Sequence, residues 1–415
     1  MKTTWAALVC AVLCAAITEQ AGAAQWVTTW AAAPLPPSVA MGPFPGTPSY
    51  TNQTIRQVVR ISAGGNRVRV RFTNEYGTKP LAIGAARVTL ADVKGNEQAA
   101  SAHTLTFAGK PTTLIPVGAP MLSDPIELRT EALATLSISI YLPENTGPCT
   151  CHQAGMQTAY VSDAGNFVDK AFPPKEKPLS RAFISGVEVE AATPTKVIAV
   201  LGDSISDGVG SSDDANHRWP DLLAERLVAR NANQGWGIAN LGISGNRLLN
   251  DGAGQSALAR FDRDILSLPG LSHVIVFLGV NDLGISYGKF PEGPLGEFFK
   301  KQVPATRPTA ESMIAGYRQL IERAHAKGVK IFGATIAPYE GAFYYSAEGN
   351  GVREQINKWM RSSGAFDAVL DFDTAFRDPQ KPTQMAIPLQ SGDHLHGSDL
   401  GYEAVAKSID LALFK

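Results

Sequence analysis

The sequence predicts an α/β protein in two parts: an all-β sandwich, followed by a three-layer α/β/α domain. In the first half, apolar residues alternate with polar ones at period two, whereas the second half alternates short apolar strands with amphipathic helices. The change falls at the proline-containing segment 190–196, which we expect to be a linker. The chain has 415 residues, more than one hydrophobic core usually serves, so two domains are expected.

The composition excludes some classes of partner. Apolar residues make up 44% of the chain and charged residues 18%, which indicates globular packing. The formal net charge is -1 and there is no long basic run, so neither a nucleic acid nor an anionic membrane surface is an expected partner.

Residues 1–24 have the features of a signal peptide. Lys2 provides the positive start, residues 5–17 an apolar run, and residues 21–23 a cleavage site of small side chains. A membrane anchor is less favoured, because spanning a bilayer takes roughly 20 apolar residues. We therefore expect a secreted or periplasmic protein whose mature chain has no integral membrane segment.

Residues 25–190 are predicted to form the β-sandwich. In NRVRVRF (66–72) and LSISIYL (136–142), every second residue is apolar, so each segment is expected to be a strand with one buried face. Turn-rich breaks separate the strands without a convincing helix between them. We interpret the arginine stripe of the first strand as a solvated sheet face rather than a site for an acidic glycan.

Residues 196–415 are predicted to form a parallel sheet covered on both faces. Each strand is followed by an amphipathic helix. The strands are expected at 196–202, 273–279 and 329–338, the helices that follow them at 219–230, 310–328 and 353–361, and a closing helix after Ser398 as N-cap.

In an open parallel sheet, ligands bind beyond the carboxyl ends of the strands. Four motifs are expected there: GDSISDG (202–208), NLGISGN (240–246), FLGVND (277–282) and GDHLHGSDLGY (392–402).

These motifs contain the groups that covalent ester hydrolysis requires. Ser204 can attack the ester, His396 can take its proton, and Asp393 can orient the imidazole. The backbone N–H groups of Ser204 and Gly245 and the side-chain amide of Asn281 can stabilise the oxyanion. This chemistry needs no cofactor and no metal.

The four motifs, in this order, resemble the blocks of the SGNH (GDSL-type) hydrolase superfamily. The matching residues are the GDS at 202–204, Gly245, the GVND at 279–282 and the pair Asp393 and His396. The resemblance covers residues 196–415 and implies a flavodoxin-like domain, with Ser204, His396 and Asp393 as triad and Ser204, Gly245 and Asn281 as oxyanion donors. Gly397 stands where many members have proline, which removes no working group.

The first half also carries a resemblance. WVTTWAAAP (26–34) and QVVRISAGGNRVRVRFTNEYG (57–77) resemble the β-sandwich that precedes the catalytic domain in some secreted microbial GDSL-type esterases. The resemblance implies a sandwich, which we expect to be jelly-roll-like.

Two other motifs invite different assignments. Ser286 in GISYG matches the nucleophile elbow G-x-S-x-G, but the strand ends near Gly279 and prolines follow where a helix is required. His394, with His396 and Asp393, could suggest a metal site, although such neighbours on a loop rarely point at one ion. Both assignments are disfavoured, and His394 is expected to line the pocket or face solvent.

Several residues are expected to be structural or stay open. Asp203 is expected to brace the turn around Ser204 by hydrogen bonds, and Asp207 is expected to be structural. The other histidines after residue 24 lack a carboxylate at comparable spacing and are assigned no chemistry: His103, His152, His217, His273 and His325. A bond between Cys149 and Cys151 stays open, as does the role of the rim aromatics 343–345 in binding a sugar, lining an acyl pocket or simply packing.

The expected function is a secreted serine esterase acting on carboxylic esters. Short acyl groups, acetate above all, on a polysaccharide are favoured, and a lipase or lysophospholipase acting on lipid esters is the alternative. A carbohydrate-binding or adhesion protein with a vestigial hydrolase domain is the alternative from another class.

Overall fold

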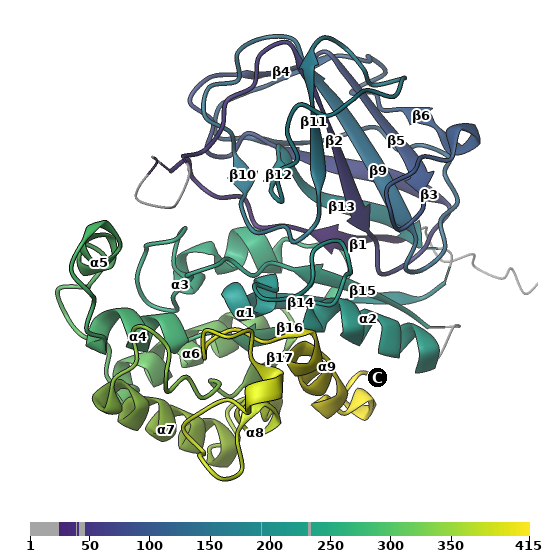
Figure 1. Ribbon diagram of the computed structural model, residues 1–415. Helices are drawn as coiled ribbons and strands as arrows, with labels where there is room; N and C mark the ends of the chain where they lie inside the picture. Colours follow the sequence, from purple (N-terminus) through teal and green to yellow (C-terminus); the bar gives the residue numbers. More distant parts are fainter. Residues whose placement is uncertain (1–24, 39, 41–45, 192, 231–233) are drawn as a thin grey trace, which may run out of the picture.

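The computed structural model describes residues 25–38, 40, 46–191, 193–230 and 234–415 (Figure 1). The expected signal peptide at 1–24 lies outside the described residues. No helix in the described ranges is long and apolar enough to cross a membrane.

The N-terminal region is built from antiparallel sheets, as predicted (Figure 1). One sheet has the order β1 (Gln25–Ala31), β13 (Ile184–Ala191), β3 (Arg67–Thr73) and β8 (Pro120–Leu122). The other has the order β11 (Ala159–Ala164), β2 (Gln53–Arg60), β9 (Thr135–Leu142), β5 (Ala85–Ala91) and β6 (His103–Thr104). The smaller elements are the strand pairs β4 (Leu81–Ile83) with β7 (Thr113–Ile115) and β10 (Cys151–His152) with β12 (Arg181–Ala182), and the 3-10 turn η1 (Ala99–Ser101).

The prediction that each strand buries one face is wrong for β9. Its serines Ser137 and Ser139 are buried together with the apolar residues of the opposite face. The reason is that charged side chains cover the polar face: Ser137 Oγ donates to a Glu97 carboxylate oxygen at 2.8 Å, and Arg56 Nε donates to Ser139 Oγ at 2.9 Å. Because β9 lies in the middle of its sheet, these polar groups find partners inside the protein.

The arginine stripe on β3 is less solvated than expected. Arg67 forms an ion pair with Glu190 of the neighbouring strand β13, and Arg69 forms one with Glu188 at 2.5 Å. The guanidinium of Arg69 also lies 4.2 Å from the centre of the Trp26 ring. Much of the stripe's charge is therefore satisfied within the protein.

The C-terminal region contains a five-stranded parallel sheet of the predicted flavodoxin-like kind. Its order is β15 (Gly235–Asn240), β14 (Thr195–Gly202), β16 (Leu271–Phe277), β17 (Lys330–Ala334) and β18 (Ala368–Leu370). In chain order this reads 2-1-3-4-5, the order of flavodoxin-like sheets.

Helices cover this sheet (Figure 1). The helix α2 packs against α9 and β15, whereas α6 packs against α7 and β17. The helices are α1 (Ser204–Asp207), α2 (Trp219–Arg230), α3 (Ala257–Arg260), α4 (Val280–Tyr287), α5 (Pro294–Lys300), α6 (Ala310–His325), α7 (Ala347–Ser362), α8 (Phe372–Phe376) and α9 (Asp399–Ser408). Short turns of other helix types are η2 (Phe261–Leu266), η3 (Ile387–Leu389) and η4 (Leu411–Leu413).

Local sequence explains where the helices begin. Ser398 caps α9 as predicted, its Oγ accepting from Gly401 N at 3.2 Å. Thr309 and Ser312 form a capping box at the start of α6. The last helix predicted from the strand-helix alternation, at 353–361, is longer than expected, because α7 already begins after the N-cap Ser346.

The expected linker at 190–196 is mostly strand. Residue 190 lies in β13 and residue 196 in β14, so both predicted boundary positions fall inside strands. The two regions are joined by hydrogen bonds: Thr28 N donates to Pro269 O at 3.0 Å, and Ile238 N donates to Ser62 Oγ at 2.7 Å. They therefore pack directly against one another, with β1 beside β15 (Figure 1).

Candidate active site

Ser204 lies directly beyond the carboxyl end of β14, which lies between β15 and β16 in the parallel sheet. It is the first residue of the one-turn helix α1 and is only 5% exposed. Asp203 caps this turn, its Oδ1 accepting from Ile205 N at 3.0 Å, which confirms its predicted bracing role.

His396 and Asp393 lie in the loop before α9 and reach Ser204. His396 Nε2 is 2.8 Å from Ser204 Oγ, and His396 Nδ1 is 2.5 Å from Asp393 Oδ2. The other oxygen of Asp393 accepts from the backbone N–H groups of Leu395 and His396 at 3.0 and 2.9 Å. Because an ionised carboxylate only accepts, Nδ1 carries the proton and Nε2 is left to accept from the serine hydroxyl.

The charge on Asp393 is secured by these contacts. Partial burial works against ionisation, but the hydrogen bond and charge of His396, together with the two backbone N–H groups, hold the pKa of Asp393 well below its usual range. A carboxylate that stays ionised can stabilise a positive imidazole beside it.

The loop after β15 brings Gly245 to the same region. Gly245 has φ +79°, in the left-handed range that favours glycine. A Cβ at Gly242 would lie 2.7 Å from the backbone nitrogen of Asp207, so glycine there allows the loop to lie directly against α1.

Asn281 lies in the first turn of α4, beyond the end of β16. Its Nδ2 donates to Asn246 O at 3.2 Å, and its Oδ1 accepts from the Tyr344 hydroxyl at 3.1 Å. These bonds orient the amide and leave the second hydrogen of Nδ2 for another acceptor. Tyr344 belongs to the rim aromatics; it is buried, whereas the neighbouring Phe343 is 48% exposed.

The alternative serine is in a different environment. Ser286 lies inside α4 and is buried, and its Oγ has no hydrogen-bond partner among the described residues. The expectation that no helix follows the strand was wrong, because the GISYG segment is itself largely helical. Ser286 therefore does not sit on a strand-to-helix elbow.

His394 does not join a metal cluster. It is partly exposed with φ +61°. Nowhere in the part of the chain that the structure describes do three or more His, Cys, Asp or Glu side chains gather to hold an ion. The two cysteines left open by the sequence, Cys149 and Cys151, form a disulfide.

Sequence reasoning missed His152. Its Nε2 lies 2.7 Å from Asp207 Oδ1, and both side chains are buried. The two residues are 55 positions apart, so no local spacing could reveal the pair. Surface pairs of the same kind join His217 to Asp399 and His325 to Asp367. The only sequence feature that pointed to this pair was Asp207, an acidic residue three positions after Ser204.

Burial changes the acid-base behaviour of Asp203. Removal from water raises its pKa to about 7; the hydrogen bond from Ile205 N opposes this, and the charge of Asp282 adds to it. Burial likewise raises the pKa of Asp282 to about 6, against hydrogen bonds from the backbone of residues 248 and 249.

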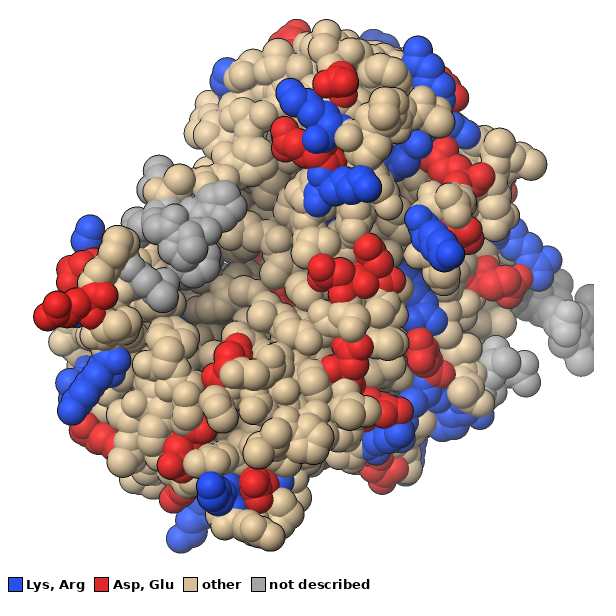
Figure 2. Space-filling model, viewed as in Figure 1, with Lys and Arg blue, Asp and Glu red and all other residues tan. Residues whose placement is uncertain are grey.

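The surface is hollowed between the two regions (Figure 2). The hollow lies in the part of the view where Figure 1 has α1 and α3. Among the described residues, most of the visible surface beside it comes from residues other than Lys, Arg, Asp and Glu (Figure 2).

The parallel sheet and its covering helices define an α/β domain with polar side chains beyond the carboxyl ends of its strands. Residues 200–404 match the model of the GDSL-like Lipase/Acylhydrolase family, slightly less than half of the chain. This segment is thus a GDSL-like lipase/acylhydrolase domain, as the sequence motifs indicated, and the chain is a hydrolase. No curated protein sequence matches the chain significantly.

Three solved structures that are similar to part of this chain have low sequence identity to it. A G-D-S-L family protein from Desulfitobacterium hafniense DCB-2 is 21% identical, covers 51% of this chain and 97% of its own, and has a TM-score of 0.37. An alpha/beta hydrolase enzyme from the metagenome of Lake Arreo, Spain, is 20% identical, with coverages of 53% and 95% and a TM-score of 0.39. A variant of an acetyl xylan esterase from Geobacillus stearothermophilus has the same identity, coverages and TM-score. At these values the likeness says nothing about the substrate of this chain.

Proposed function

We propose that this chain is a serine esterase that hydrolyses carboxylic esters through Ser204, His396 and Asp393. The observation that carries the proposal is the series of two hydrogen bonds, 2.8 Å from Ser204 Oγ to His396 Nε2 and 2.5 Å from His396 Nδ1 to Asp393. Nucleophile, base and orienting group then act as one unit.

In the proposed reaction, Ser204 Oγ attacks the carbonyl carbon while His396 Nε2 takes the hydroxyl proton. The carbonyl oxygen becomes an oxyanion, which would accept from the N–H groups of Ser204 and Gly245 and from Asn281 Nδ2. Collapse of this intermediate breaks the bond to the alcohol, which leaves with the proton from His396. Water, which gives a proton to His396 Nε2, then attacks the acyl carbon. This step releases the acid and restores the Ser204 hydroxyl.

We further propose that the substrates are short acyl esters, above all acetyl esters on a carbohydrate. The rim aromatics support this, since the exposed Phe343 adjoins Tyr344, which contacts the proposed donor Asn281. The centre of the Phe343 ring lies 5.0 Å from that of Phe299, and the Phe299 ring stacks on Phe290 with their centres 5.5 Å apart. An aromatic row of this kind suits a sugar ring, whereas a long acyl chain would need a deep apolar pocket.

The expected signal peptide at 1–24 supports the proposal that the enzyme works outside the cytoplasm, where polysaccharides are accessible. Secretion can be tested by the N-terminus and mass of the protein recovered from culture medium or periplasm. A product that keeps residues 1–24 would contradict this part of the proposal.

The decisive experiment is hydrolysis of p-nitrophenyl esters from acetate to palmitate, by the wild-type protein and two serine variants. Ser204→Ala should lose at least about 10³-fold in kcat, because the proposed acyl-enzyme forms on Ser204 Oγ. Ser286→Ala is the matched control, since it removes the hydroxyl of a buried serine outside the proposed site, and it should keep wild-type activity.

Each result has a distinct meaning. Activity highest on acetate supports the acetyl-esterase proposal, and a maximum at long chains favours the lipid-ester alternative. Full activity in Ser204→Ala would overturn the triad. A folded wild-type protein inactive on every ester would favour a binding or adhesion protein with a vestigial hydrolase domain.

A further inference from the structure

A histidine of the N-terminal region contacts the helical turn that carries Ser204. His152 follows the disulfide-bonded Cys151 in strand β10 and lies, almost fully buried, against the turn that carries Ser204. We propose that His152 is a positioning residue for the oxyanion donors, which it holds in place through Asp207. This inference rests on the proposed esterase function.

Both ring nitrogens of His152 have acceptors. Nδ1 lies 3.0 Å from the carbonyl oxygen of Ala33, and Nε2 lies 2.7 Å from Asp207 Oδ1. Two acceptors favour a doubly protonated ring: burial opposes the charge, but Asp207 and the Ala33 carbonyl outweigh it and raise the pKa of His152. The contact is therefore a buried ion pair between the two regions of the chain.

Asp207 connects His152 to the loop between β15 and α3 (residues 241–256), which carries Gly245 and is called the oxyanion loop below. Its second carboxylate oxygen accepts from both the backbone N–H of Ser244, at 3.1 Å, and the Ser244 hydroxyl, at 2.9 Å. Its own backbone N donates to Asp203 O at 2.9 Å within the Ser204 turn. The Asp207 carboxylate thus links the helical turn that carries Ser204 to Ser244, the residue before Gly245. His152 holds the other oxygen of the same carboxylate.

The position of this loop matters for the chemistry more than for binding. Donors stabilise an oxyanion only at about 2.7–3.1 Å from the position where the charge develops. Without His152, one oxygen of the buried Asp207 carboxylate loses its partner. The carboxylate can then change position to reach another donor, and Ser244 can shift with it. A small displacement of Gly245 N would then lower kcat without weakening the binding of the ground-state ester.

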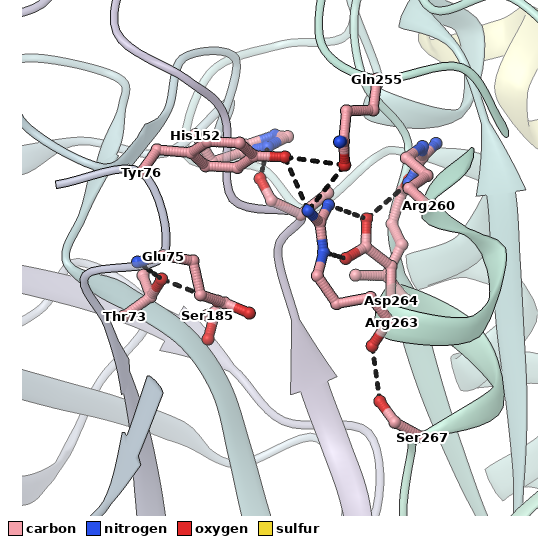
Figure 3. Close-up of polar contacts among 12 residues, drawn as sticks. Thr73, Glu75, Tyr76, His152, Ser185, Gln255, Arg260, Arg263, Asp264 and Ser267 are labelled. Carbon is pink, nitrogen blue, oxygen red and sulfur yellow. Dashed lines mark hydrogen bonds and ion pairs between the residues drawn. The ribbon is translucent and has the colours of Figure 1, made fainter. Parts of the chain in front are cut away.

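A second contact from the N-terminal region supports the far end of the same loop. Tyr76 accepts from Arg263 at 2.6 Å and donates to Gln255 at 3.0 Å (Figure 3). Arg263 and Arg260 share the carboxylate of Asp264, and Arg260 donates to Asn246 Oδ1 at 3.1 Å. Both ends of the loop are therefore tied to the N-terminal region, although Tyr76 acts through more intermediates than His152.

The experiment compares two neutral replacements of His152 in the full chain. In His152→Gln, the amide nitrogen can take the place of Nε2 and still donate to Asp207. In His152→Asn, the shorter amide can replace only Nδ1, so Ala33 keeps a donor and Asp207 loses one. The control is Glu225→Gln. This variant weakens a different ion pair between the two regions, in which Glu225 Oε1 lies 2.7 Å from Arg60 Nη1.

We expect kcat for p-nitrophenyl acetate to fall about 10- to 100-fold in His152→Asn, with KM nearly unchanged, and to recover largely in His152→Gln. The control Glu225→Gln should keep wild-type kcat. Thermal unfolding of each variant shows whether the activity follows the hydrogen bond to Asp207 or only the stability.

Three results would overturn the inference. Wild-type kcat in His152→Asn would do so, as would equal losses of kcat in the Gln and Asn variants that parallel their losses of stability. Ser204→Ala, measured alongside, separates the two proposals: if it is inactive while His152→Asn is normal, only this inference fails. If Ser204→Ala remains active, the proposed function fails and this inference fails with it.

Discussion

At the scale of single residues, the amide of Asn281 is held at both ends. Tyr344 donates to its oxygen and its nitrogen donates to the Asn246 carbonyl, so the remaining N–H points in a direction set before substrate arrives. Pre-oriented donors of this kind need no reorganisation when the charge develops.

We predict that Asn281→Ala lowers kcat about 10²- to 10³-fold with a small change in KM, because its proposed hydrogen bond to the oxyanion would form mainly in the transition state. Steady-state kinetics on p-nitrophenyl acetate measures this. Tyr344→Phe keeps the Asn281 amide but removes the hydroxyl that donates to its oxygen. The kcat of this variant should therefore lie between those of Asn281→Ala and the wild type. Unchanged kcat in Asn281→Ala would remove this residue from the oxyanion site.

At the scale of elements, the one-turn helix α1 is capped by a carboxyl group that burial disfavours as an anion. The pKa of Asp203 is raised from 3.8 to about 7. The folded state therefore retains the proton over a range in which the unfolded chain has released it. This contribution to stability is complete below about pH 4 and is lost as pH rises through about 7.

We predict that Asp203→Asn flattens this pH dependence. Asparagine keeps the side-chain oxygen that accepts from Ile205 N but cannot ionise. The thermal unfolding midpoint of the variant should therefore decline less between about pH 5 and about pH 8 than that of the wild type. Asp213→Asn, which changes an exposed carboxyl, is the control and should follow the wild-type curve. Parallel curves for all three proteins would argue against a raised pKa at Asp203.

At the scale of the whole molecule, the two regions share one continuous core. Val27 and Trp30 of β1 belong to the same cluster of buried apolar residues as Trp236 and Ile238 of β15. Backbone and side-chain hydrogen bonds and the buried His152–Asp207 pair cross the same boundary. The regions are therefore expected to depend on each other for stability.

We predict that the two regions unfold in a single cooperative transition. Urea unfolding followed by tryptophan fluorescence and by far-UV circular dichroism should give coincident curves, since loss of either region exposes the core of the other. Two separated transitions would indicate domains that fold independently, and would weaken the argument that the N-terminal region supports the active site.

The sequence by itself determined the layers of the fold and the residues that meet at the strand ends. Periodicity of two and of about four distinguishes strands from helices, and Ser204, Gly245, Asn281 and His396 each follow a strand or precede a helix. Parallel strands deliver such residues to one edge, so their convergence could be predicted without knowing any distance.

Only the tertiary structure decided which distant side chains become partners. The His152–Asp207 pair and the charged cover over the serines of β9 both depend on contacts between segments far apart in the chain. Ser286 shows the same limit in one motif, because the packing of α4 rather than its five-residue pattern put it in a helix interior. Local patterns describe what a segment can form, whereas burial and pairing depend on what the rest of the molecule places against it.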